Sequence, residues 1–359
     1  MTDLTSHDDC PIVLVAPGTG GHVFPAVAVA QTAFTRHIPV ILVTDDQGLA
    51  LAKPYADLFY QTYVIPKMSF SGMIHTIRDM WSMIRGHKPR CMIGFGTKNS
   101  LIPMLTGWAL HVPTAIHQSD TLLGRANKVL SFLVKKVFTG YPVAVYGEST
   151  TEKWHYVGTP VRTEFSPVAR ASHHYAGDDQ TLNVLIVGGS QGATLWTSIV
   201  PNAIRLLSDQ NQRRLSVVHQ HRPEDASALE RGYSGLKCAY QTVPFIDDIS
   251  VAMNRADLVF SRAGGSTIAE LIYMAKPSLL VPYAHSANNH QKKNARFMHD
   301  HGLAFIQYED GLKPAILASL IERCLRSPSF LKEVRQKLSR WPHPDSATVM
   351  LNIMVGENA

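Results

Sequence analysis

The sequence has few cysteines and no long apolar run. Its four cysteines, Cys10, Cys91, Cys238 and Cys324, lie far apart and form no C-x-x-C pair. This spacing excludes a disulfide framework or a cysteine-based metal site and favours buried or free thiols in a reducing compartment. No apolar run reaches roughly eighteen residues, so no membrane-spanning helix is expected. The opening MTDLTSHDDC carries acids where a secretory signal would be basic, so we expect a cytoplasmic protein.

Charge is sparse and unevenly placed. Charged residues make up 17% of the chain and hydrophobic residues 45%, as in a globular protein without low-complexity tracts. The net charge of +6 weakly favours an anionic partner. Most of the excess lies between residues 67 and 98, where the cations Lys67, Arg78, Arg85, Lys88, Arg90 and Lys98 are opposed by Asp79 alone.

Short apolar runs alternate with helical patterns along the chain, which is typical of parallel α/β architecture. Many runs are apolar at every position, as strands covered by helices on both faces should be. The expected strands cover residues 11–17, 39–44, 91–95, 113–117 and 135–140, and then 183–189, 215–220, 257–262 and 277–283.

The pattern starts again in the second half of the chain. LIVGGSQGA (185–193) repeats the strand, glycine loop and helix start of VLVAPGTGGH (13–22). We therefore expect two doubly wound α/β domains in tandem, with a boundary near residues 157–171, which are rich in proline and small residues. Ligands of such domains bind in the cleft outside the carboxyl ends of the strands.

The loop GTGGH (18–22) follows the first expected strand. Glycines at a strand end let the backbone approach a phosphate, and the next helix directs its N–H groups toward it. The spacing matches neither G-x-G-x-x-G nor the P-loop, so dinucleotide and NTPase sites are not indicated. A tight turn alone would explain the glycines, but it would not require His22. In the first turn of a helix this imidazole would be neutral near pH 7 and able to accept a proton.

Two further glycine loops follow strands in the second half. GGSQGA (188–193) offers backbone amides and the Ser190 hydroxyl to a phosphate-bearing group. In SRAGGSTIAE (261–270) a structural alternative has equal standing, because Thr267 and Glu270 fit the S/T-x-x-E capping box. In the functional interpretation, the amides at this helix start bind a diphosphate and the Glu270 carboxylate binds a ribose diol.

Polar side chains gather at two more strand exits. HSANNHQKKNA (285–295) concentrates amides and imidazoles that suit sugar hydroxyls, with an ordinary solvated loop as the alternative. IHQSDTLLGRANK (116–128) places His117, Gln118 and Asp120 just past a strand end, where they are expected to face the ligand cleft.

The segment SGMIHTIRDMWSMIRGHKP (71–89) carries one apolar stripe at helical spacing with cations beside it. We predict that this stripe packs into the core, and its alternative is contact with the anionic face of a membrane. The stripe consists of Met73, Ile74, Ile77, Met80, Trp81 and Ile84, flanked by Arg78, Arg85 and Lys88.

The motifs GTGGHVFPA, VGTPVR, VLIVGGSQGA, PFIDDI, ADLVFSRAGGSTIAE, LLVPY and HQKKNA occur together in one order. In this combination the chain resembles the MurG family of bacterial N-acetylglucosaminyltransferases over nearly its whole length. The resemblance implies a GT-B fold, in which two Rossmann-like doubly wound domains, residues 1–162 and 163–340, face a cleft. A C-terminal helix, residues 341–359, is expected to return to the first domain.

The resemblance implies inverting transfer of GlcNAc from UDP-GlcNAc to the MurNAc 4-hydroxyl of undecaprenyl-diphosphate-muropeptide, the step from lipid I to lipid II in peptidoglycan synthesis. No cofactor or metal is expected, and no D-x-D acid pair follows a strand. The implied partners are UDP-GlcNAc, lipid I, the cytoplasmic membrane surface and other cell-wall and division proteins, with no nucleic acid. Such an enzyme is peripheral, at the cytoplasmic face of the inner membrane.

The resemblance also assigns roles to individual residues. His22 is the implied general base on the acceptor hydroxyl. Residues implied in acceptor binding are Gly18, Lys98 and Asn127. Residues implied in donor binding are Thr19, Gly20, Gly21, Asp120, Arg162, Ser190, Ile246, Gly265, Ser266, Thr267, Glu270, His290 and Gln291.

Two stretches depart from the family pattern. The family usually has H-E-x-N where this chain has HQSD (117–120), and a G-G-Y-x-S loop where this chain has GFGTKNS (94–100). These departures keep two alternatives open: a weakened relative that binds UDP-sugar or lipid as a scaffold, and a UDP-sugar transferase with another lipid acceptor. A dinucleotide oxidoreductase is disfavoured by the absence of G-x-G-x-x-G.

Overall fold

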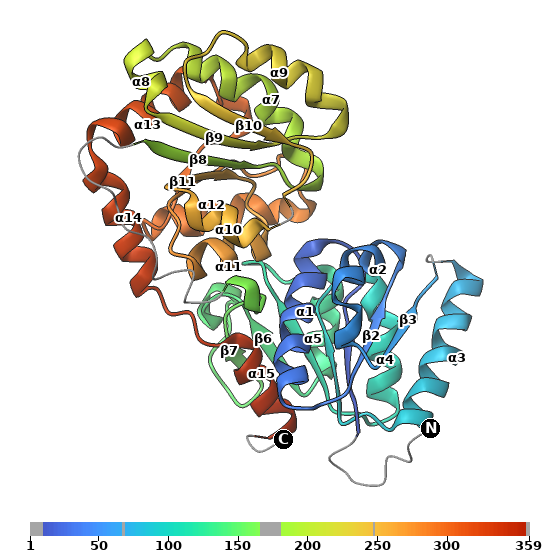
Figure 1. Ribbon diagram of the computed structural model, residues 1–359. Coiled ribbons are helices and arrows are strands. Elements are labelled where there is room, and N and C mark those ends of the chain that lie inside the picture. The colour runs from blue at the N-terminus through green and yellow to red at the C-terminus, as the bar shows by residue number, and fades with distance from the viewer. Residues whose placement is uncertain (1–9, 67–68, 166–180, 247, 357–359) are drawn as a thin grey trace. The chain divides into compact units, whose positions relative to one another are not determined.

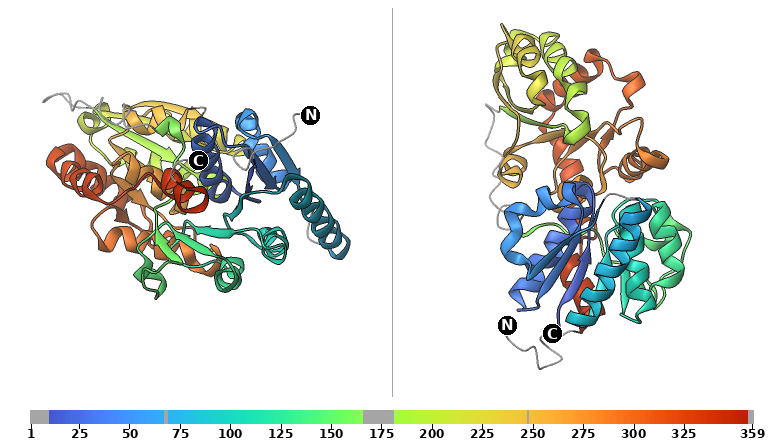
Figure 2. Two further views of the ribbon diagram at one scale, coloured as in Figure 1. Left: turned by 90° about the horizontal axis from the view of Figure 1, so that it is seen from below. Right: turned by 90° about the vertical axis from the view of Figure 1, so that its right-hand side faces the viewer.

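The computed structural model describes residues 10–66, 69–165, 181–246 and 248–356, without the side chains of residues 189–193 and 287. The chain divides into two compact units, Met1–Thr163 with His343–Ala359, and Glu164–Pro342. Each unit is built on one parallel sheet with helices on both faces (Figure 1; Figure 2).

The sheet of the first unit has seven strands in the order β3-β2-β1-β4-β5-β6-β7. All of its described strand pairs are parallel, and Ile12 of β1 lies between Val40 of β2 and Cys91 of β4. The central strands are buried along their whole length, which explains their uninterrupted apolar sequences. The strands are β1 Ile12–Val15, β2 Val40–Thr44, β3 Gln61–Val64, β4 Cys91–Gly94, β5 Thr114–Gln118, β6 Lys136–Thr139 and β7 Trp154–Tyr156.

Helices cover both faces of this sheet because successive side chains of a strand point to opposite sides. Ile12 and Leu14 pack into one core with α1 and α15, whereas Val13 and Val15 pack into the other core with α3, α4 and α5. The helices are α1 Gly20–Thr35, α2 Asp46–Ala52, α3 Phe70–His87, α4 Leu101–Ala109, α5 Arg125–Leu133 and α15 Ser346–Val355.

The last helix belongs to the first unit. Met350 and Leu351 of α15 are fully buried in the core that α1 covers. The Arg36 guanidinium at the end of α1 donates to the Asn352 side chain over 2.7 Å. The first unit therefore contains residues from both ends of the described chain.

The sheet of the second unit repeats the same order, β10-β9-β8-β11-β12-β13. The pairs are again parallel, and β8 lies between β9 and β11. The strands are β8 Leu182–Val187, β9 Leu215–Gln220, β10 Ala239–Val243, β11 Leu258–Ser261, β12 Ser278–Leu280 and β13 Phe305–Ile306.

Large side chains fill the core on one face of the second sheet. Trp196 of α7 stacks on Phe260 of β11 with ring centroids 5.8 Å apart, and Tyr233 of α9 is fully buried beside them. In Figure 1, α7, α9 and α13 lie on this face and α10, α11 and α12 on the other. The helices are α7 Gly189–Arg205, α8 Asp209–Arg213, α9 Ala226–Tyr233, α10 Ile249–Arg255, α11 Gly265–Tyr273, α12 His290–Asp300, α13 Pro314–Arg326 and α14 Pro328–Arg340.

The shared strand order confirms the predicted fold class of two doubly wound sheets. In each unit the direction of winding reverses beside the first strand, between β1 and β4 and between β8 and β11. Loops that follow these neighbouring strands leave the same edge of the sheet side by side, which is where such folds bind ligands. The glycine loops after β1, β8 and β11 and the loop after β4 all stand at these edges.

Candidate functional site

His22 lies in the first turn of α1. The first glycine loop, residues 16–22, leaves β1, and the helix begins at Gly20 after the N-cap residue Thr19, whose side chain caps no backbone amide. The hydroxyl Oγ1 of Thr19 lies 3.4 Å from Nδ1 of His22. No acidic residue occupies the first turn, so the positive end of the helix dipole is not compensated there by a carboxylate of α1.

The β4–α4 loop, residues 95–100, reaches the same corner of the first unit. Gly96 has φ +104°, and a Cβ added to it would lie 3.2 Å from Cδ2 of His22 and 3.6 Å from Nδ2 of Asn127. Only a glycine lets the imidazole lie this close to the loop backbone. The structure thus brings His22, Gly96 and Asn127 together, and the neighbouring Lys98 is exposed.

Gly18 is held by an acid that sequence reasoning missed. Its backbone N–H donates to Oδ1 of Asp45 over 2.9 Å, so this amide is already engaged. Asp45 follows the buried strand β2 directly, and an acid at such a strand exit was the signal available in the sequence. Gly18 has φ +97°, a conformation that favours glycine.

His117 and Gln118 are the last residues of β5 and point into the protein. Nε2 of His117 lies 2.9 Å from the Gly158 carbonyl, and burial lowers its pKa to about 4. The amide oxygen of Gln118 accepts from the Gly124 N–H and from Nδ2 of Asn127, each over 3.0 Å. The strand β5 continues through both residues and both side chains are buried, so their contact with a ligand stays a prediction.

Asn127 lies behind this corner and is 1% exposed. Its Nδ2 donates to the His117 carbonyl as well as to Gln118. Asn127 therefore fixes the end of β5 to the start of α5, and its contact with an acceptor stays a prediction.

Asp120 is half-buried beyond the end of β5, next to tyrosines. The Tyr146 hydroxyl donates to the Asp120 carbonyl over 2.7 Å. Burial, and secondarily the charge of Asp120, raises the pKa of Tyr141 and of Tyr146 well above their ordinary value. A tyrosine-lined carboxylate of this kind can accept hydrogen bonds from sugar hydroxyls.

Arg162 is 8% exposed and held by residues of the first unit. Its Nη1 donates to the Tyr55 hydroxyl over 2.8 Å, and its guanidinium lies 4.2 Å above the Phe24 ring. Phe24 belongs to α1, so Arg162 lies against the helix that carries His22. Its contact with a diphosphate stays a prediction.

The second unit offers two helix starts at its sheet edge. Ser190 is the second residue of α7, directly after β8, and its side chain lies outside the described residues. Ile246 is half-buried in the loop between β10 and α10. The other start is α11, where the N-cap residue is Gly264 and Gly265, Ser266 and Thr267 form the first turn.

The capping-box interpretation of Thr267 and Glu270 is wrong. In that motif Thr267 would be the N-cap residue, but α11 begins at Gly265 after the N-cap Gly264. Glu270 therefore stands in the second turn and is 8% exposed. The start of α11 presents backbone N–H groups with no side-chain cap, which suits a diphosphate.

Gln291 joins two strand exits beside α11. Its Oε1 accepts from the Tyr283 N–H over 3.0 Å and from the Ala263 N–H over 3.3 Å. The amide oxygen is thus engaged, and the Nε2 donors are the part of the side chain that suits a sugar oxygen. His290 is half-buried and begins α12.

An ion pair that sequence reasoning missed supports this edge. Arg262 binds Glu309 and donates to the Val281 carbonyl over 3.1 Å. It thereby links the residue before the α11 loop to the exit of β12. Among the described residues, no group of three or more His, Cys, Asp or Glu side chains could hold a metal ion.

The apolar stripe of α3 is mostly exposed. Met80 and Ile84 are buried, but Ile74, Ile77 and Trp81 are 54%, 45% and 46% exposed. The predicted core packing of the whole stripe is therefore wrong. The Arg85 guanidinium lies 4.7 Å above the Trp81 ring. Further exposed apolar residues are Trp108 on α4, which packs against α3, and Val129 and Phe132 on α5, which packs against α4.

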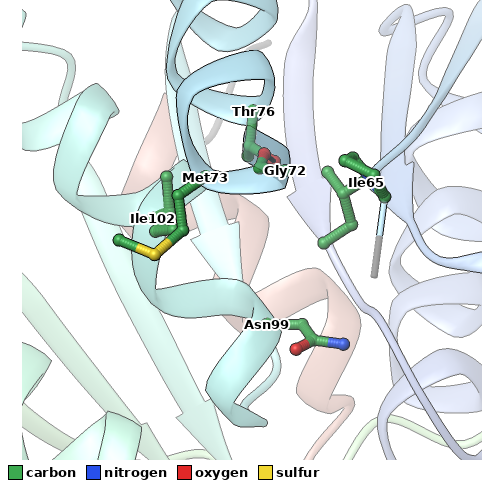
Figure 3. A pocket seen from close by; sticks show the side chains of 7 residues that line it. Ile65, Gly72, Met73, Thr76, Asn99 and Ile102 are labelled. Carbon is green, nitrogen blue, oxygen red and sulfur yellow. Dashed lines mark hydrogen bonds between the residues drawn. The ribbon is translucent and has the colours of Figure 1, made fainter. Parts of the chain in front are cut away.

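A small hollow lies beside the start of α3. Ile65, Met73 and Ile102 line it with Thr76 and Asn99, among other residues (Figure 3). It has room for little more than a water molecule and is no ligand site by itself. In the described part of the chain, no helix is long and apolar enough to cross a membrane.

Comparison with known proteins gives consistent matches. Residues 12–139 match the glycosyltransferase family 28 N-terminal domain and residues 183–349 match its C-terminal domain. The enzyme UDP-N-acetylglucosamine--N-acetylmuramyl-(pentapeptide) pyrophosphoryl-undecaprenol N-acetylglucosamine transferase of Agrobacterium fabrum is 33% identical over 96% of this chain and 93% of that protein. Its namesake in Rhodospirillum centenum is 31% identical over 96% and 94%.

Solved structures agree on the fold. The crystal structure of Acinetobacter baumannii MurG superposes with a TM-score of 0.78 at 24% identity, covering 96% of this chain and 99% of that one. A UDP-GlcNAc 2-epimerase from Neisseria meningitidis bound to UDP-GlcNAc superposes with a TM-score of 0.70 at 13% identity, covering 96% and 99%. These likenesses show the GT-B-like arrangement of two parallel sheets.

Proposed function

The chain belongs to glycosyltransferase family 28, as a MurG-like UDP-GlcNAc transferase, and from this premise we infer its acceptor and mechanism. We propose that it transfers GlcNAc, with inversion, to the 4-hydroxyl of MurNAc on undecaprenyl-diphosphate-muropeptide. The observation that carries the proposal is His22, a titratable side chain at the start of α1 with its ring against Gly96.

The second unit binds the donor in this proposal. The diphosphate of UDP-GlcNAc accepts hydrogen bonds from the first-turn amides of Gly265, Ser266 and Thr267, where the α11 dipole favours negative charge. The Glu270 carboxylate accepts from the ribose hydroxyls, and the backbone of Ile246 binds the uracil. Glu270 lies in the second turn of α11, outside the position of a capping residue, and this supports the assignment.

Further donor contacts are proposed for the residues that the resemblance implies. Ser190 and Arg162 bind the diphosphate, Thr19, Gly20 and Gly21 lie near the phosphates and the reacting sugar, and the GlcNAc hydroxyls are bound by Asp120, His290 and Gln291. Gln291 supports this role because its two engaged acceptor contacts orient the amide.

The reaction follows from these positions. O4 of MurNAc attacks the anomeric carbon of GlcNAc on the face opposite UDP, while the bond from that carbon to the diphosphate oxygen breaks. The electron pair leaves with UDP, whose charge the α11 amides stabilise. The proton of O4 passes to His22. Gly18, Lys98 and Asn127 belong to the acceptor side, with the exposed Lys98 ammonium suited to the lipid diphosphate.

The HQSD departure is compatible with activity. Gln118 is 7% exposed, and its amide oxygen accepts from two donors that the loop requires. An amide at this position therefore preserves the local structure without a buried charge. The exchange therefore leaves the local structure that an active transferase would need intact.

The exposed α3 residues support peripheral association with the cytoplasmic face of the membrane. Apolar side chains beside Arg78, Arg85 and Lys88 suit the interface of a bilayer with anionic lipids. A lipid-linked acceptor is confined to that surface, so such contact brings the enzyme to its substrate.

The experiment is incubation of the purified chain with radiolabelled UDP-GlcNAc and a lipid I analogue. We expect radiolabel in an extractable lipid-linked disaccharide, and none when the lipid analogue is omitted. Release of UDP with no labelled lipid would contradict the proposed acceptor. Labelling of a different polyprenyl sugar in preference to lipid I would establish the alternative transferase.

A further inference from the structure

Asp45 connects three backbone segments of the first unit. Its Oδ1 accepts from the Gly18 N–H over 2.9 Å and from the Gly48 N–H over 3.0 Å, the second bond capping α2. Its Oδ2 accepts from Nδ2 of Asn99 over 3.1 Å. One carboxylate therefore binds the first glycine loop, the start of α2 and the β4–α4 loop.

The β4–α4 loop is conformationally demanding at this point. Thr97 has φ +72°, a left-handed conformation that is rare for a β-branched residue. A Cβ added to Gly18 would lie 3.3 Å from Cγ2 of Thr97, so the two loops are in close contact. Such a conformation persists only where its surroundings enforce it, and the Asp45–Asn99 bond is one such constraint.

Both loops carry residues of the proposed reaction. His22 follows Gly18 by four residues, and its ring lies against Gly96, while Lys98 stands between Thr97 and Asn99. A small shift between these loops would move the base relative to the acceptor, and misplacement by about 1 Å can cost about a hundredfold in rate.

We propose that Asp45 is a positioning residue: through Asn99 it fixes the loop that carries Lys98 against the loop that carries His22. The catalytic consequence of this inference rests on the proposed function. The fixed position of the two loops rests on the hydrogen bonds alone. Asp45 itself has no contact with a substrate in this proposal.

Two single variants separate this role from helix capping. Asp45→Ser keeps an N-cap side chain for α2 but is too short to hold Asn99, and Asn99→Ala removes the same bond from the other partner. We expect each to lower kcat/KM for the lipid acceptor by about tenfold to about a hundredfold, with the Kd for UDP unchanged by calorimetry. The matched control is Asp46→Asn, an exposed neighbouring acid, which should behave as the wild type.

A swap provides the rescue. In Asp45→Asn combined with Asn99→Asp, the side-chain oxygen at 45 keeps the Gly18 and Gly48 bonds while its NH₂ donates to the new carboxylate. We expect this pair to recover kcat/KM to within about threefold of the wild type, as directly coupled residues do. The impaired parent is Asn99→Asp, which sets two carboxylates against each other, whereas Asp45→Asn alone should be mild, because Oδ1 of Asn99 has no partner among the described residues and the Asn99 amide can turn to accept from the new amide.

Amide hydrogen exchange gives a readout without substrate. Asp45→Ser and Asn99→Ala should each speed exchange of residues 94–101, and the swap should restore protection. Wild-type kcat/KM in both single variants, or wild-type exchange in both, would overturn the inference. If the wild type forms no lipid-linked product, the proposed function fails, whereas faster exchange in the variants would still establish the fixed loops.

Discussion

The two units have the same strand order but present different chemistry at the edge of the sheet. In the first, the helix after β1 carries an imidazole, and a glycine of the next loop makes room for it. In the second, the helix after β11 carries only small residues and backbone amides in its first turn. In the proposed function, the same architecture thus supplies a proton acceptor in one unit and an anion-binding helix start in the other, because the loops and not the strands carry the functional groups.

The largest expected effect concerns the proposed general base of the first unit, His22. His22→Ala should lower kcat by about a hundredfold to ten thousandfold, as removal of a general base does, while leaving the Kd for UDP unchanged. Steady-state kinetics with a lipid I analogue and calorimetry with UDP measure the two quantities. Unchanged turnover would remove His22 from the mechanism and with it the distinction between the units.

Low pH should destabilise the folded first unit, because its buried residue His117 resists protonation. Burial lowers the pKa of His117 from 6.5 to about 4, so the folded state disfavours its protonated form. The free energy of unfolding should therefore be highest above pH 6.5 and fall between pH 6.5 and pH 4, by about 3 kcal/mol for this group. His117→Gln should flatten this dependence in chemical denaturation, whereas the exposed control His75→Gln should not. A pH dependence as steep in His117→Gln as in the wild type would contradict the assignment.

In the proposed function, the affinity of the second unit for UDP depends on Glu270. Glu270→Ala should raise the Kd for UDP by about tenfold to a hundredfold, the cost of hydrogen bonds to a charged group. Calorimetry decides: an undiminished affinity for UDP would leave Glu270 outside the donor site.

The smallest effect concerns the surface of the first unit. Changing Trp81 and Ile77 to Ser, one at a time, should weaken association with anionic vesicles by about tenfold each, since less apolar area enters the bilayer. Both side chains are about half exposed, so the fold should survive. Met80→Ser, one position away and buried, should instead destabilise the unit. Vesicle sedimentation in which Trp81→Ser binds like the wild type would refute the membrane contact.

The central strands were predictable from sequence because burial on both faces leaves them apolar throughout. The edge strands β3, β7, β10 and β13 were not, since each is partly exposed and two of them carry polar residues such as Gln61 and Gln241. Their existence depends on the neighbouring strand offering free backbone groups, which the local sequence does not record.

Sequence motifs located candidate residues at strand exits, as at His22 after β1, and the structure places His22 in the first turn of α1, while its catalytic role stays a prediction. Local patterns were wrong where the surrounding fold decides. Thr267 and Glu270 match a capping box, but the turn after β11 starts the helix at Gly265. The α3 stripe has the spacing of a core helix, yet only the face with Met80 and Ile84 meets the sheet. The hydrogen bonds of Asp45 join segments that are far apart in the chain, so no local sequence motif indicates them.

The placement of α15 has a consequence for how the protein is made. Met350 and Leu351 complete the core that begins at Ile12, so the first unit cannot close that core until these late residues have left the ribosome. The second unit, whose sheet is contributed by residues 182–306, can fold earlier during synthesis. We therefore expect the first unit to complete its core only after the second unit has been synthesised, although most of the first unit's residues precede the second unit in the chain.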